Sequence, residues 1–87
     1  MRLDKFLQIS GIVRRRTVAK EMCDSGRVKV NGVIAKGSKD VKVGDRIEVE
    51  YWDKVVAFEV LDLPERPKRG FSSSQIYRVV GEKRIRG

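Results

Sequence analysis

The stretch Val28-Lys29-Val30-Asn31-Gly32-Val33-Ile34 is the sharpest local signal in the chain. Valines alternate with a charged residue before Asn-Gly, and two further apolar residues follow it. Alternation with a period of two predicts a half-buried strand. Asn-Gly supplies the two positive-φ positions of a type I′ turn, which joins two antiparallel strands. The stretch therefore predicts a β-hairpin.

Two helical patterns precede this hairpin. Residues 2–13 place Leu3, Phe6 and Leu7 at the three-and-four spacing of a buried stripe, and Ser10-Gly11 should weaken or end the helix. A second helix is predicted over residues 15–25, and a left-handed glycine at Gly26 should end it. The apolar side of this second helix consists of Val18, Ala19, Met22 and Cys23.

Strand patterns follow over residues 46–51, 55–61 and 75–80. Polar or Gly/Pro/Ser-rich stretches at 35–40 and 64–74 are typical of loops, and the basic end at 81–87 is expected to fray. The fold class is therefore α+β, with two N-terminal helices packed on a small, mostly antiparallel sheet. We expect residues 1–51 to form the main part of one small domain, 52–80 to be strands that complete the same domain, and 81–87 to be a basic tail.

The charge of the chain limits its function. With 87 residues and a net charge of +8, it is one small domain that favours a polyanionic partner. The first 20 residues carry six basic side chains and one acidic one. The absence of histidine removes most nucleophile pairs and zinc sites, and no phosphate-binding glycine motif is present. We therefore expect a binding protein without enzymatic activity, cofactor, metal or membrane span.

The arginine run Arg14-Arg15-Arg16 stands where the second helix should begin. A solvated face is the simplest interpretation of such a run. However, cations at a helix N-terminus oppose the helix dipole by about 0.3–1 kcal/mol each, whereas the same position attracts phosphate. Arginine also presents a planar fork of donors that fits phosphate oxygens. These arguments favour RNA binding. The Thr17 hydroxyl can either cap the helix or contact a phosphate, and we expect the cap.

Three stretches in fixed order carry a family resemblance: "MRLDKFL", "RRRTVAKEMCDSGRVKVNG" and "DVKVGDRIEV". Together they resemble the S-four-type RNA-binding domain, which has an αL-like fold, over residues 1–51. As a short stand-alone chain, the sequence is similar to the RqcP proteins of bacterial ribosome quality control. It is less similar to the related heat-shock ribosome-recycling proteins, since it lacks their long basic extension.

The resemblance implies a factor on the large ribosomal subunit. We expect the chain to be cytoplasmic, since it has one cysteine and no signal peptide or long apolar run, and to be a monomer. Its expected partners are large-subunit rRNA, P-site peptidyl-tRNA and a quality-control protein that recruits alanyl-tRNA, and its expected role is to support template-free alanine tailing of the stalled chain. A recycling or assembly factor, and an RNA-delivery subunit of a separate enzyme, are the alternatives. The resemblance implies RNA contacts at Arg2, Lys5, Arg15 and Arg16, but Gly11 stands where relatives often carry a basic residue.

The complete set of predicted site residues falls into two groups. The first group contacts RNA, and the second supports the local structure. Asp4 is expected to orient Arg2 or an arginine of the second helix, and Asn31-Gly32 to form the hairpin turn. The expected RNA contacts are Arg2, Lys5, Arg14, Arg15, Arg16, Lys20 and Lys29, and the expected supporting residues are Asp4, Thr17, Asn31 and Gly32.

Overall fold

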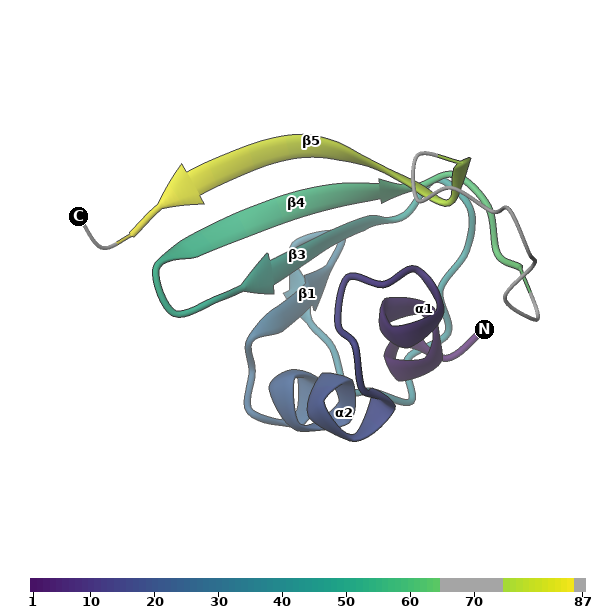
Figure 1. Ribbon diagram of the computed structural model, residues 1–87, viewed down its shortest axis with the longest axis horizontal. Coiled ribbons are helices and arrows are strands. Elements are labelled where there is room, and N and C mark those ends of the chain that lie inside the picture. Colours follow the sequence, from purple (N-terminus) through teal and green to yellow (C-terminus); the bar gives the residue numbers. More distant parts are fainter. Residues whose placement is uncertain (65–74, 86–87) are drawn as a thin grey trace.

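Two short helices, α1 (Leu3–Ile9) and α2 (Arg16–Asp24), lie on the same face of a sheet in the computed structural model (Figure 1). The structure describes residues 1–64 and 75–85. The strands are β1 (Val28–Val30), β2 (Val33–Ile34), β3 (Arg46–Glu50), β4 (Lys54–Val60) and β5 (Tyr77–Arg84). All neighbouring strands are antiparallel, in the order β2-β1-β3-β4-β5. The predicted α+β class is confirmed.

The helix α1 ends at the Ser10-Gly11 break that the sequence predicts, before the outer limit of the helical pattern at Val13. It stops at Ile9, and Gly11 then has a φ of +80°, a left-handed conformation that cannot continue the helix. The Ser10 hydroxyl donates a hydrogen bond to the Leu7 carbonyl oxygen at 3.1 Å. A serine side chain that bonds nearby backbone competes with helix continuation. The predicted break at Ser10-Gly11 is therefore confirmed, and only the outer limit at Val13 was wrong, although Val13 is 8% exposed and belongs to the core.

The glycine after α2 behaves as predicted. Gly26 has a φ of +82°, and its N–H donates to the Cys23 carbonyl oxygen at 3.0 Å. This left-handed residue turns the chain from α2 into β1 and satisfies one of the carbonyl groups that a helix end leaves open.

The predicted hairpin is confirmed. Asn31 and Gly32 have φ values of 52° and 85°, and Val30 pairs with Val33 across the turn. The Asn31 side chain also ties the turn to the start of β3. Its amide nitrogen donates to Asp45 at 3.1 Å, and its oxygen accepts the backbone N–H of Arg46 at 3.0 Å.

The last strand is longer than expected. The structure places residues 81–84 in β5, where Lys83 lies opposite Val55 and Arg84 opposite Lys54. The prediction that this segment frays is therefore wrong as far as Arg84, because β4 offers a continuous partner for its backbone groups. The N–H of Ile85 still donates to the Asp53 carbonyl oxygen at 3.0 Å. Most of the predicted 64–74 loop and the final two residues lie outside the described residues.

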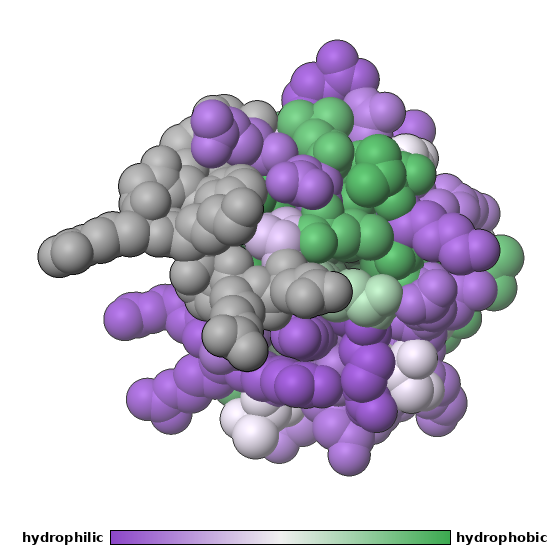
Figure 2. All heavy atoms as spheres, turned by 90° about the vertical axis from the view of Figure 1, so that its right-hand side faces the viewer, coloured by the Kyte–Doolittle hydropathy of each residue, from purple (hydrophilic) through white to green (hydrophobic). Residues whose placement is uncertain are grey.

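The core lies between the helices and the sheet. Leu3, Phe6 and Leu7 of α1 are fully buried, as is Ala19 of α2. Val18 departs from the predicted apolar side of α2, since 41% of it is exposed. A domain this small cannot bury all its apolar side chains. Figure 2 shows one apolar patch among hydrophilic residues on the side of the molecule where α1 lies.

The aromatic side chains mostly pack in or against this core. Phe58 is 5% exposed and meets the ring of Tyr77 edge to face, with centroids 5.1 Å apart. Trp52 differs, because it lies in the bend between β3 and β4 and is 75% exposed.

Candidate RNA-binding site

Asp4 joins two arginines that lie 14 residues apart in the sequence. One carboxylate oxygen of Asp4 lies 3.1 Å from Nη2 of Arg2, and the other lies 3.3 Å from Nη2 of Arg16. Asp4 is 2% exposed, whereas the two arginine side chains are 50% and 45% exposed. A buried carboxylate therefore orients two half-exposed guanidinium groups, one before α1 and one at the first residue of α2.

The loop at residues 37–39 fixes the position of Asp4. The backbone N–H of Asp4 donates to the Gly37 carbonyl oxygen at 3.1 Å, and that of Leu3 donates to the Lys39 carbonyl oxygen at 2.8 Å. These bonds satisfy N–H groups that the start of a helix leaves open. A Cβ atom on Gly37 would lie 3.1 Å from Asp4 Oδ2 and 3.3 Å from its Cβ. Gly37 therefore allows the loop to close directly over the carboxylate.

The charge of Asp4 is maintained by its partners. Burial by itself would raise the pKa of this carboxyl group, but the hydrogen bond from Arg2 and the charge of Arg16 outweigh it, with a smaller contribution from the backbone N–H of Lys5. The pKa of Asp4 is therefore lowered from its ordinary value, and the carboxylate remains ionised at neutral pH.

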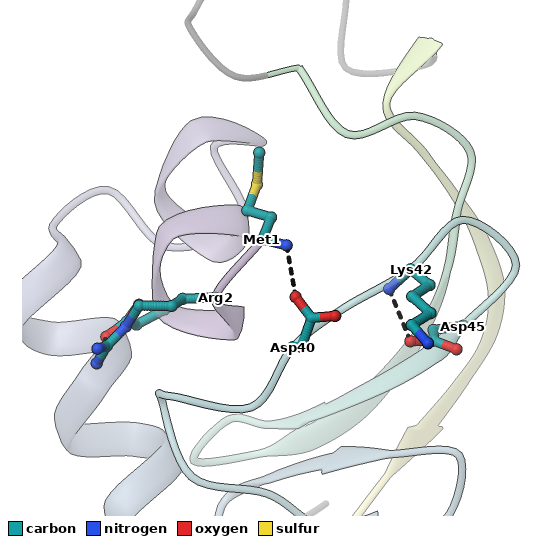
Figure 3. Close-up of polar contacts among 6 residues, drawn as sticks. Met1, Arg2, Asp40, Lys42 and Asp45 are labelled. Atoms are coloured by element: carbon teal, nitrogen blue, oxygen red, sulfur yellow. Dashed lines mark hydrogen bonds and ion pairs between the residues drawn. The ribbon is translucent and has the colours of Figure 1, made fainter.

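The N-terminus holds the backbone of Arg2 in place. The Met1 amino group lies 2.7 Å from Oδ1 of Asp40, and the Met1 carbonyl oxygen accepts the N–H of Val41 at 2.7 Å. Figure 3 shows Met1 pointing toward Asp40, while the Arg2 side chain extends away from it. The hydrogen bond and charge of the Met1 amino group lower the pKa of Asp40. Nearby, Asp45 accepts the Lys42 N–H at 2.9 Å and shapes the turn before β3 (Figure 3).

Arg14 and Arg15 precede α2 with exposed side chains. Within residues 1–64 and 75–85, neither forms an ion pair. Arg15 is the N-cap residue, with extended backbone and no side-chain cap. The prediction that Thr17 caps the helix was therefore wrong, because α2 begins one residue before it, at Arg16. Thr17 lies inside the first turn, with its side chain exposed.

The three predicted lysines lie in different surroundings. Lys20 is exposed one turn after Arg16, on the same side of α2, and Lys5 is half-buried in α1. Lys29 lies on the face of the sheet that points away from the helices, since its neighbours Val28 and Val30 face the core. Its cross-strand neighbour there is Glu48. The structure therefore does not bring Lys29 to the arginines.

The two turn residues have the geometry expected of supporting residues. Asn31 and Gly32 occupy the two left-handed positions of the hairpin, and Asn31 bonds Asp45 and the backbone of Arg46. Sequence reasoning missed the part played by Gly37, because a glycine in a polar loop carries no local signal that it will pack on a residue 33 positions earlier.

Cys23 is a packed thiol rather than a reactive one. It is 1% exposed, and burial, together with the charges of Asp4 and Asp24, raises its pKa to about 11. In the described part of the chain, no group of His, Cys, Asp and Glu side chains could hold a metal ion. None of the described helices is long and apolar enough to span a membrane.

The chain is similar to known proteins in sequence and, for two solved structures, in fold. The S4 domain family matches residues 1–47. The chain is 44% identical over 85 residues to the RQC P-site tRNA stabilizing factor of Streptococcus pneumoniae, covering 98% of this chain and 96% of that protein. It is 41% identical over 85 residues to the factor of the same name from Bacillus subtilis, covering 98% of both.

Two solved structures resemble the chain over most of its length. The solution structure of the hypothetical protein HP1423 has a TM-score of 0.77 and 36% identity, covering 93% of this chain and 98% of that one. The trimeric structure of Vibrio cholerae Heat Shock Protein 15 has a TM-score of 0.81 and 28% identity, covering 92% and 81%. The chain belongs to the S4 domain family and, within it, to the family of RQC P-site tRNA stabilizing factors.

Proposed function

We propose that this chain is a non-catalytic, cytoplasmic RNA-binding factor of bacterial ribosome quality control. In this proposal it binds the large ribosomal subunit that carries peptidyl-tRNA, contacts rRNA and the P-site tRNA, and supports template-free alanine tailing by a protein that recruits alanyl-tRNA. The name shared by its relatives, RQC P-site tRNA stabilizing factor, supports the choice of particle.

The pairing of Arg2 and Arg16 through Asp4 is the observation that carries this proposal. A guanidinium group already oriented by a buried carboxylate loses less side-chain entropy when it binds a second anion. One Asp4 carboxylate serves two guanidinium groups, so the unit keeps a net positive charge. Their outer donors remain half-exposed and can reach phosphate oxygens.

The run Arg14-Arg15 extends this surface. Its two exposed cations have no acidic partner within the described residues, so they add attraction for a polyanion. We define the basic edge as Arg2, Arg14, Arg15, Arg16 and Lys20. Structured RNA recognised through its shape and phosphates fits this edge better than base-specific reading of a single strand.

A ribosome-recycling or assembly factor is the second candidate, favoured by the likeness to Heat Shock Protein 15. Purification of the tagged chain from bacterial cells, followed by identification of the bound particle, separates the two. Quality control predicts free large subunits with peptidyl-tRNA. Recovery of immature particles, or of large subunits without peptidyl-tRNA, would contradict a role in quality control.

The matched variants for this purification are Arg15→Ala and Arg84→Ala. Each removes one positive charge, but Arg84 lies on β5, outside the basic edge. Recovery of the particle should fall with Arg15→Ala and remain with Arg84→Ala. Equal loss from both variants would show that only total charge matters and would contradict a positioned basic edge.

A further inference from the structure

A hollow at the start of α2 is lined by both apolar and cationic residues. It has a volume of about 530 Å³ and is lined by Val13, Arg14, Arg15 and Val18. This volume is within the range of about 300–1,000 Å³ that is typical of small-ligand sites. Val13 belongs to the core, whereas Val18 is 41% exposed. The hollow is therefore apolar where it meets the core and cationic along one side.

The two arginines favour an anionic group, whereas Val18 favours an apolar or weakly polar part of a ligand. Within the described residues, Arg14 and Arg15 form no ion pair, so both guanidinium groups are available to an anion. An anion alone would gain nothing from Val18, because an aliphatic side chain offers it no hydrogen bond. A ligand with a flat, weakly polar body and an attached anionic group could contact Val18 with the body and the two arginines with the anionic group.

We propose that this hollow receives one unpaired nucleotide of the bound RNA. Its base lies against Val13 and Val18, and Arg14 and Arg15 hold the adjoining phosphates. The inference rests on the proposed RNA-binding function and adds to it a preference for RNA with a bulged or looped-out nucleotide. A paired base cannot serve, since it is stacked within its helix and its faces are covered.

The test compares two RNA hairpins that differ at one position. One carries a single bulged 2-aminopurine, and the other carries the same nucleotide paired with an inserted uridine. Affinity is measured at fixed salt, because phosphate contacts make RNA affinity depend on salt. The bulged hairpin should bind about fivefold more tightly, which corresponds to about 1 kcal/mol. Its 2-aminopurine fluorescence should rise on binding as the base leaves its stacked neighbours.

The variant Val18→Thr keeps the shape of the side chain but replaces a methyl group with a hydroxyl, and it should abolish the preference for the bulged hairpin. Val33→Thr is the control, because Val33 is also exposed, at 68%, but lies on β2. It should leave the preference unchanged. Circular dichroism of each variant checks that the fold is retained, as expected for substitutions at exposed positions.

Three results would overturn the proposal in different ways. Equal affinity for both hairpins would show that the chain binds RNA without an unpaired nucleotide. Failure to bind either hairpin or the large subunit would reject the proposed function itself. Binding of an acidic, leucine-containing peptide can be measured in the same way. If Val18→Thr abolished binding of this peptide but left the preference for the bulged hairpin unaffected, the hollow would be assigned to a protein partner.

Discussion

Arg16 Nη2 lies 3.3 Å from Oδ1 of Asp4, so the first residue of α2 is joined to the first turn of α1. The same carboxylate also binds Arg2. This contact has two consequences, since it fixes the two helices relative to each other and it orients two cations toward solvent.

The variant Asp4→Asn separates these consequences. It keeps the shape of the side chain but removes its charge, so the free energy of unfolding should fall by about 1–2 kcal/mol. This figure is below that of a fully buried ion pair, because both arginines are about half exposed. Urea unfolding measures this change in the free energy of unfolding. Affinity for the large subunit should also fall, although the net charge rises by one.

Asp40→Asn is the matched control for Asp4→Asn, because Asp40 binds the Met1 amino group with its own side chain 66% exposed. It should change stability much less. If Asp4→Asn instead raised the affinity for RNA, total charge rather than orientation would govern binding.

Stability should depend on pH through the same carboxylate. The pKa of Asp4 is lower in the folded state than in the unfolded chain, so the unfolded chain binds the proton more readily. The stabilisation is therefore complete above the ordinary carboxyl pKa of about 4 and is lost as pH falls through that range and below it. Thermal unfolding between pH 7 and pH 2 measures the loss.

Asp4→Asn should flatten this acid limb of the stability curve. Asp40, whose pKa is also lowered, should account for part of what remains, and Asp40→Asn tests that share. An acid limb identical in wild type and Asp4→Asn would show that the Asp4 contacts do not contribute to stability.

Salt dependence should report the number of phosphate contacts at the basic edge. For Arg15→Ala and Arg16→Ala, each lost contact should flatten the slope of log affinity against log salt by about 0.7–0.9. Fluorescence anisotropy with a large-subunit rRNA fragment measures the slope. Arg84→Ala should leave the slope unchanged. An unchanged slope and affinity in all three variants would exclude phosphate contacts at Arg15 and Arg16.

Gly37→Ala should weaken both the fold and the site. A Cβ atom there would lie 3.1 Å from Asp4 Oδ2, so the loop or the carboxylate must shift. We expect a loss of about 1–3 kcal/mol in the free energy of unfolding, as for other overpacked sites. Gly81→Ala is the control, because its Cβ would meet neighbours only at an ordinary 3.8 Å. Equal stabilities of the two variants would contradict the close packing of Gly37 on Asp4.

Cys23 should resist alkylation while the protein is folded. With a pKa of about 11 and 1% exposure, almost none of the thiol is ionised or accessible at pH 8. Its reaction with iodoacetamide should become fast only when urea unfolds the chain. Fast reaction of the native protein, followed by mass spectrometry, would show that α2 opens readily from the sheet.

Local patterns predicted much of the fold. The Asn31-Gly32 turn, the glycine after α2 and the alternation in β3 each depend on neighbours within a few residues, so their sequences predict their structures. The break of the first helix at Ser10-Gly11 was predicted as well, whereas the extent of β5 was mispredicted, since it depends on pairing with β4.

The candidate site also combines features set by local sequence with features set by contacts between distant residues. The sequence by itself determined that the cations gather near the starts of two helices, because basic residues and helical periodicity can be read along the chain. Only the tertiary structure decided which of them lie together. It placed Gly37 against Asp4, joined Arg2 to Arg16, and sent Lys29 to the opposite face of the sheet. Such contacts link residues far apart in sequence, and packing in three dimensions selects them.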